Sequence, residues 1–169
     1  SEYEVSRNNK TMSNMKLLDG DEVIRSFITY DGDEIFIASE TGFAVRYPLD
    51  MVPLTSPRSK GVKAMKLVDD VIGDACIYHQ DNNQLVVFSK NGAVKRMKLS
   101  EIEITGRPAK GNMLCKKVKS KPYKIAHLQM YDLNDEVYIM GKDICSVVSK
   151  DIPSNVLALG IPCRVIKNI

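Results

Sequence analysis

Basic side chains recur at a fixed spacing along this chain. Of all the residue patterns in the sequence, this one points most clearly to a binding function. Arg46 is followed fifty positions later by Arg96. The segment 58–61, with the sequence RSKG, returns as 107–111, with the sequence RPAKG. Cations held at regular intervals on a rigid scaffold suit a ligand whose negative charges are regularly spaced. The recurring arginines and lysines therefore predict a polyanion-binding surface.

The charge is also segregated along the chain. The net charge is only +3, but the stretch 107–124 carries seven basic residues and no acid. Acidic residues gather instead at 19–22, 31–34 and 132–136, just before predicted strands, where turns are expected. Such local segregation matters more for polyanion binding than the net charge does. The residues predicted to contact the polyanion are Arg46, Arg58, Lys60, Lys63, Lys95, Arg96, Arg107, Lys110, Lys116 and Lys117.

The apolar segments repeat with the same period. The sequence DEIFI at 33–37 returns as NQLVV at 83–87 and as DEVYI at 135–139. A period near fifty, with strand-like runs and punctuating glycines, indicates a radial β array with one four-stranded blade per repeat. We therefore predict an all-β, propeller-like domain with about three blades. The predicted division is a blade remnant at 1–30, blades at 31–80 and 81–131, and a degenerate terminal blade at 132–169.

Strand signals dominate, and no sustained 3.6-residue apolar stripe predicts a helix. Most of the runs have four to seven residues and are rich in Val, Ile, Phe and Tyr, and turns such as Asn91-Gly92 separate them. The predicted strands are Val23–Thr29, Ile35–Ser39, Ala44–Pro48, Val62–Leu67, Ala75–Tyr78, Leu85–Ser89, Val94–Leu99, Met113–Val118, Ile125–Met130, Val137–Met140, Ile144–Ser149 and Arg164–Lys167.

The third repeat departs from the pattern. Ile144 stands at the position of the turn glycine, and Val148 stands at the position of the arginine. The sequence VLALG at 156–160 replaces the basic loop. We therefore expect a blade that has lost its cationic site. Circular arrays of such blades usually close with four to eight, so we expect the remaining blades from a longer chain or from elsewhere.

The composition excludes several classes of function. Hydrophobic residues make up 44% and charged residues 27%, as in soluble globular proteins. The four cysteines form no Cys-x-x-Cys pair, and with only two histidines no metal-ligand cluster appears. No apolar run approaches membrane-spanning length, and the N-terminus has no signal-peptide layout. We predict no catalytic residues, no cofactor and no metal in this segment, and no membrane partner.

Corresponding corners of successive blades line one edge of a disc, so the repeated cations predict a basic rim. Such a rim could follow the phosphates of duplex DNA, which carries about one charge per 1.7 Å of axis. The glycine of each Lys-Gly pair would let a main-chain N–H approach a phosphate oxygen. Binding would be neutral to sequence and depend on DNA bending. The alternative for Lys63, Lys66, Lys98 and Lys119 is the solvated face of a sheet.

These segments resemble a known family. The stretches 42–46 with 58–67, and 91–102 with 106–111, resemble blades of the C-terminal domain of bacterial type IIA topoisomerase A subunits. The stretch 117–125 is similar to the late blades of the topoisomerase IV type of this protein. The resemblance implies a β-pinwheel whose blades exchange strands, with DNA bent around its rim. It also implies a cytoplasmic, nucleoid-associated enzyme with further A-subunit domains and an ATPase B subunit, whose ATP and Mg²⁺ act elsewhere.

Three alternatives remain at the sequence level. One is the gyrase type, which wraps DNA for supercoiling; its glutamine-and-arginine box has no match here, and 57–61 is the nearest segment. A second is a protein-docking propeller, for which a chain with no Trp and four Phe offers few aromatic anchors. The third is a resemblance of 146–167 to the C-terminal coil of hexapeptide-repeat acyltransferases, whose six-residue turns residues 1–140 lack.

Overall fold

The computed structural model describes residues 15–56, 58–79, 84–114, 122 and 124–131, together with the backbone of four strands between 137 and 168. By contacts the chain divides into two units, Ser1–Met130 and Tyr131–Ile169, and each is described by itself. The described residues form β-strands and two short 3-10 helices, which confirms the predicted all-β class. They contain no helix that is long and apolar enough to span a membrane.

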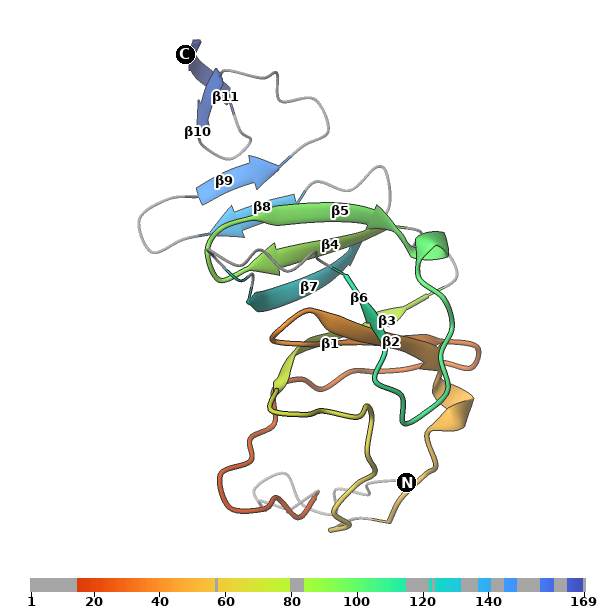
Figure 1. The fold of residues 1–169 in the computed structure, drawn as a ribbon. Helices are drawn as coiled ribbons and strands as arrows, with labels where there is room; N and C mark the ends of the chain where they lie inside the picture. The colour runs from red at the N-terminus through yellow and green to blue at the C-terminus, as the bar shows by residue number, and fades with distance from the viewer. Residues whose placement is uncertain are drawn as a thin grey trace, which may run out of the picture. The chain divides into compact units, whose positions relative to one another are not determined.

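The first blade is a sheet built around one hairpin (Figure 1). Side chains along its central strand alternate between two apolar clusters: Phe36 and Ala38 lie in one, and Ile37 in the other. A strand buried on both faces needs a continuous apolar run, and IFIA supplies it. In the hairpin turn, Gly42 has φ +98° and its N–H donates to the Ser39 carbonyl. In order across the sheet, the strands are β3 (Ile72–Tyr78), β1 (Glu34–Ser39), β2 (Phe43–Pro48) and β6 (Asn112–Met113).

The fourth strand of this blade comes from the next repeat. In β6, Asn112 pairs with Ala44 and Met113 pairs with Phe43, so the second repeat completes the sheet of the first. This arrangement confirms the strand exchange that the family resemblance implied. Gly111, immediately before β6, has φ +81°, and a Cβ built there would lie 2.0 Å from the Ala44 carbonyl oxygen. Only glycine lets the backbone approach β2 this closely.

The second blade repeats the plan of the first (Figure 1). A hairpin is again joined on one side by a strand that follows a long loop, in the order β5-β4-β7. In each blade a 3-10 turn follows the second strand of the hairpin. The elements are β4 (Gln84–Ser89), β5 (Val94–Lys98) and β7 (Ile125–Tyr131), with turns η1 (Leu49–Met51) and η2 (Leu99–Glu101).

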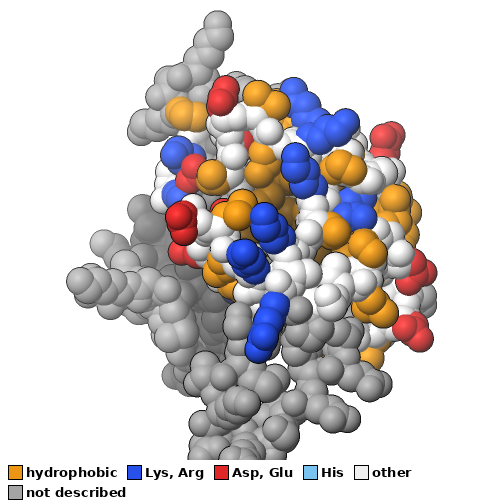
Figure 2. Space-filling view, turned by 90° about the horizontal axis from the view of Figure 1, so that it is seen from below, with side chains coloured by type: hydrophobic (Ala, Val, Ile, Leu, Met, Phe, Trp, Pro, Cys, Tyr) orange, Lys and Arg blue, Asp and Glu red, His pale blue; other side chains and the backbone are white. Residues whose placement is uncertain are grey.

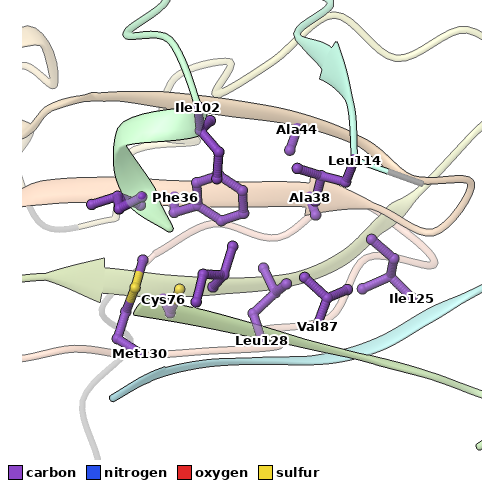
Figure 3. Close-up of a cluster of buried hydrophobic side chains, with 12 residues drawn as sticks. Phe36, Ala38, Ala44, Cys76, Val87, Ile102, Leu114, Ile125, Leu128 and Met130 are labelled. Atoms are coloured by element: carbon purple, nitrogen blue, oxygen red, sulfur yellow. The ribbon is translucent and has the colours of Figure 1, made fainter. Parts of the chain in front are cut away.

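The main core lies between these two blades. Phe36, Ala38 and Ala44 of the first sheet face Val87 and Leu128 of the second (Figure 3). The residues that complete the cluster are Cys76, Leu85, Leu99, Ile102, Leu114, Ile125 and Met130. Burial raises the pKa of the Cys76 thiol to about 12, so this thiol is inert packing material. The face of each sheet that lines this core is buried only because the neighbouring sheet packs on it. The two repeats therefore depend on one another for stability.

One buried carboxylate ties the two blades together. The Asp74 side chain on β3 is 3% exposed and accepts hydrogen bonds from the backbone N–H groups of Ala75 and Leu128, the latter on β7. It also pairs with Arg25 at 2.7 Å and with the Nδ1 atom of His127 at 2.7 Å. Burial alone would raise the pKa of Asp74, but these donors outweigh burial and hold its pKa below the usual value. The carboxylate is therefore ionised at neutral pH.

The unit Tyr131–Ile169 contains two hairpins. Strand β8 (Val137–Met140) pairs with β9 (Cys145–Val148), as the sequence predicted. Strand β10 (Val156–Leu159) pairs with β11 (Arg164–Asn168). The sequence pattern predicts β11 but not β10, because 156–160 stands where the other repeats have a basic loop. Since the replacement residues are apolar, the segment pairs as a strand.

Two predicted strands are wrong within the first unit. Residues 23–29 and 62–67 form no strand, apart from one bridge between Met65 and Ala109. In the first blade, β3 pairs with a hairpin that begins thirty-eight residues earlier, whereas no described strand precedes 23–29. A run with strand propensity forms no ladder without a neighbour. Of the predicted strand Met113–Val118, the structure describes only the start, within β6.

We predict that Gly111→Ala will destabilise the chain by about 3 kcal/mol or more, because its methyl group would overlap the Ala44 carbonyl and force β6 away from β2. Gly61 is the matched control: it occupies the same place one repeat earlier, has φ +75° and has nothing within 4 Å of the position a Cβ would take. Gly61→Ala should cost only the backbone strain, about 1 kcal/mol. Urea unfolding of both variants measures the difference, and equal losses would contradict the strand-exchange explanation.

We also predict that Asp74→Asn will destabilise the chain at pH 7 by about 2–3 kcal/mol, the worth of hydrogen bonds to a charged group. The lowered pKa makes the contribution of Asp74 complete above about pH 4, the unfolded value, and lost as pH falls through the folded value. The gap between the two proteins should therefore shrink in acid. Asp31→Asn, in an exposed turn, is the control. A gap that stays constant between about pH 7 and about pH 2.5 would refute this.

Candidate nucleic-acid interface

Lys and Arg side chains follow one another across one face of the molecule (Figure 2). The predicted cations Arg58, Lys60 and Lys63 lie in the loop between η1 and β3, and all three are exposed. Their side chains make no hydrogen bond or ion pair within the part of the chain that the structure describes. Ammonium and guanidinium groups without a protein partner remain available for an anion.

Consecutive repeats bring their basic segments side by side through a backbone contact that itself repeats. The Lys66 N–H donates to the Ala109 carbonyl at 2.8 Å, and fifty residues earlier the Lys16 N–H donates to the Ser59 carbonyl at 3.0 Å. The first contact joins the stretch before β3 to the Lys-Gly loop of the following repeat, and the second joins the equivalent stretch fifty residues earlier to the loop at 58–61. The basic loops therefore stand at equivalent positions of successive repeats, as the rim model requires.

The structure places the predicted contact Arg46 against protein groups, at the junction between the two blades. Its guanidinium pairs with Glu34 at 2.5 Å and donates to the Leu99 and Ile102 carbonyls of the second blade. It also lies over the Tyr78 ring, and its side chain is only 13% exposed. Five donors in a planar fork suit this multiple contact between blades. Its recurrence as Arg96 marks an equivalent position in the hairpins of the two blades.

Arg107 is also engaged within the protein. Its guanidinium donates to the carbonyls of Met51 at 2.8 Å and Lys63 at 3.1 Å, so it holds the preceding repeat's loop in place. The Lys110 ammonium, three residues later in the same loop, lies 4.8 Å from the centre of the Phe43 ring, and the residue is exposed. Of these two predicted contacts, only Lys110 presents its charge outward.

The remaining predicted residues also include one side chain that is bonded within the protein and one that has no described partner. The Lys95 ammonium donates to the Leu114 carbonyl at 2.5 Å, whereas Arg96 is exposed and has no side-chain partner among the described residues. Lys116 and Lys117 lie outside the described residues. The Lys-Gly glycine was expected to approach a phosphate, but at Gly111 its close approach is to the neighbouring strand β2.

Two further lysines lie next to the basic loops: Lys16, which was not among the predicted contacts, and Lys66, for which the solvated face of a sheet was the alternative. Both are exposed, and both stand beside a Lys-Gly loop of the following repeat. The available signal was the return of MKLLD at 15–19 as MKLVD at 65–69. That repeat showed equivalent lysines, but only the tertiary structure shows which loop lies next to them.

Each of the two histidines lies against a buried carboxylate. The Nδ1 atom of His79 lies 2.8 Å from Oδ1 of buried Asp33, which also accepts from the Tyr30 N–H. His127 is held by Asp74 and stacks on Phe88. Within the described part of the chain, no group of three or more His, Cys, Asp or Glu side chains is placed to hold a metal ion.

The chain is similar to several known proteins. It is 31% identical over 126 residues to the A subunit of DNA topoisomerase 4 from Bacillus subtilis, and 29% identical over 117 residues to its counterpart from Streptococcus pneumoniae. These alignments span 75% and 69% of this chain but only 16% and 14% of the relatives. The chain therefore covers about a sixth of the length of the curated relatives it matches.

Solved structures and a family model agree with these similarities. The C-terminal domain of DNA topoisomerase IV superposes with a TM-score of 0.76 at 26% identity, over 83% of this chain and 44% of that one. The DNA gyrase A C-terminal domain superposes with a TM-score of 0.60 at 26% identity, over 65% and 38%. The family model of the DNA gyrase C-terminal domain, beta-propeller, matches residues 33–73 and 83–130. Because those stretches make up more than half of the 169 residues, this chain belongs to that family of β-propeller domains.

Proposed function

We propose that this chain binds duplex DNA through its backbone phosphates, without sequence preference, as the DNA-handling part of a topoisomerase IV-like A subunit. The observation that carries the proposal is the set of exposed cations at 58–63, which are unpaired among the described residues. Lys110 occupies the place in the next repeat that Lys60 occupies in this one, and the same backbone contact recurs beside both loops. Family membership supports it, because the relatives are named as DNA topoisomerase subunits.

The kind of readout follows from the elements that carry these cations. In the described residues the helical turns are only three residues long, so no helix there can enter a major groove. Cations on loops and strands of a rigid sheet are suited to contact phosphates. Such contacts position the duplex but carry no sequence information. Affinity should therefore fall steeply as salt rises, since each neutralised phosphate releases counterions.

Topoisomerase IV is favoured over gyrase as the parent type. The C-terminal domain of topoisomerase IV superposes over more of this chain and with a higher TM-score than the gyrase domain. The gyrase-type alternative, in which the domain wraps DNA chirally for supercoiling, keeps support from the family model and from that second structure.

The rest of the parent enzyme is likewise a proposal, because the chain covers about a sixth of its relatives. We propose that strand cleavage and religation occur in other A-subunit domains, and that an ATPase B subunit supplies ATP- and Mg²⁺-dependent strand passage. This chain would bend DNA segments and present them to that machinery. Its expected setting is the bacterial cytoplasm, in association with the nucleoid.

Fluorescence anisotropy with a labelled random-sequence duplex of about 40 base pairs tests the proposal directly. We expect micromolar or tighter binding, a steep dependence on salt and no preference between two unrelated sequences. No binding at low salt would overturn the proposal and leave the protein-docking alternative.

The double variant Arg58→Ala/Lys60→Ala should weaken this binding and lower the salt slope by about 0.9 for each phosphate that the variant no longer neutralises. Arg107→Ala is the matched comparison, because its guanidinium is already bonded to two carbonyls. We expect Arg107→Ala to lower the unfolding temperature and to leave the salt slope nearly unchanged. The reverse result, a slope change only for Arg107→Ala, would show that the assignment of these arginines is wrong.

The two parent types differ in what binding does to DNA topology. Nicked circular DNA sealed by ligase in the presence of the chain reports any wrapping as a change in linking number. Bending without chiral wrapping, the topoisomerase IV-like outcome, should leave the linking number unchanged. A one-signed shift that grows with protein concentration would favour the gyrase-like alternative.

A further inference from the structure

We propose that the unit of phosphate binding is a pair of lysines contributed by two consecutive repeats, Lys66 with Lys110 and Lys16 with Lys60. This inference rests on the proposed function and specifies where on the surface a phosphate would bind. It places the site at the junction between repeats, so a single repeat would contain only half of it.

The first pair is held by a strand-like contact. Met65 and Ala109 form a parallel bridge, and the next N–H, that of Lys66, donates to the Ala109 carbonyl. Met65 is only 5% exposed, and Ala109 packs against the same apolar cluster. Because side chains alternate along extended chains, the next residues, Lys66 and Lys110, point to the opposite side. Both are exposed.

The two lysines of this pair stand on neighbouring backbone segments. Strands joined by such a bridge run about 4.8 Å apart, so the two side chains leave the backbone as immediate neighbours. Like charges placed side by side on adjacent strands destabilise the pairing. A bound anion would relieve that repulsion, and a phosphate oxygen can accept from two ammonium groups at once.

No protein group neutralises the pair within the described residues. Neither lysine forms an ion pair with a described carboxylate, although Glu40 accepts Lys90 and Lys124 elsewhere on the same two blades. Among the described residues, the Lys110 ammonium lies against the Phe43 ring, which orients the cation and leaves its charge in place. The backbone contact therefore fixes where the two lysines lie, and no described carboxylate forms an ion pair with either of them.

The second pair shares the backbone hydrogen bond of the first at an interval of fifty residues, although Met15 is 48% exposed where Met65 is buried. The Lys16 N–H donates to the Ser59 carbonyl, and Lys60 follows Ser59 just as Lys110 follows Ala109. Lys16 and Lys60 are exposed as well, and neither forms an ion pair with a described carboxylate. One pair for each junction yields a regular series of phosphate contacts, as a duplex that follows the rim requires.

A double-mutant cycle with the full chain tests the pair. The variants Lys66→Gln, Lys110→Gln and the double variant are compared by anisotropy on the duplex of about 40 base pairs at several salt concentrations. If both lysines hold one phosphate, each single variant should weaken binding about three- to tenfold. The double variant should lose less than the product of the two, and its salt slope should fall by about 0.9 in total. Lys98→Gln, an exposed lysine on β5, is the control.

The outcomes separate this inference from the proposed function. If the unaltered chain shows no salt-dependent binding, the proposed function fails and the pair fails with it. If the unaltered chain binds but the variants bind no more weakly than Lys98→Gln, only the lysine-pair inference is overturned. The same conclusion follows if the loss of affinity in the double variant equals the product of the losses in the two single variants. The same double-mutant cycle on Lys16 and Lys60 tests the second pair independently. Unfolding temperatures no lower than that of the unaltered chain confirm that the variants are folded.

Discussion

The structure depends on how the free edge of strand β2 is paired. An edge strand exposes unpaired N–H and C=O groups, and here the following repeat covers them with Asn112 and Met113. Gly111 makes this possible because any side chain at that position would overlap the Ala44 carbonyl. The exchange brings the chain back over the first blade, and on its way it places Arg107 against the preceding loop and Lys110 against Phe43. Strand pairing between repeats therefore also positions the candidate binding surface.

Charged groups have two different roles at the junction between blades. Asp74 and Arg46 turn inward, where each satisfies backbone groups of the neighbouring blade. Buried charges are tolerated only when they are paired and hydrogen-bonded, and both meet that condition. Lys60, Lys63 and Lys66 turn outward and are left without a partner among the described residues. The same repeat thus carries one set of charges that joins blades and another that stays available for a ligand.

This division suits a protein that handles DNA without reading it. Phosphates are evenly spaced along a duplex, and junctions between repeats are evenly spaced along the chain, so each new repeat extends the contact without a new recognition element. Affinity would then come from the number of junctions engaged. The chain covers 44% of the topoisomerase IV C-terminal domain to which it is similar.

The sequence by itself determined the class and the repeat. Alternating or continuous apolar runs with glycine turns predicted β1, β2, β4, β5 and β7 closely, because those signals are local. Residues 23–29 have the same propensity but form no strand, and the described residues include no earlier strand with which they could pair. Arg46 and Arg58 were equivalent candidates as recurring cations, and only the tertiary structure separated the one facing carbonyls from the one facing solvent. Side-chain chemistry is encoded locally, whereas the partner of each charge depends on contacts between residues about fifty positions apart.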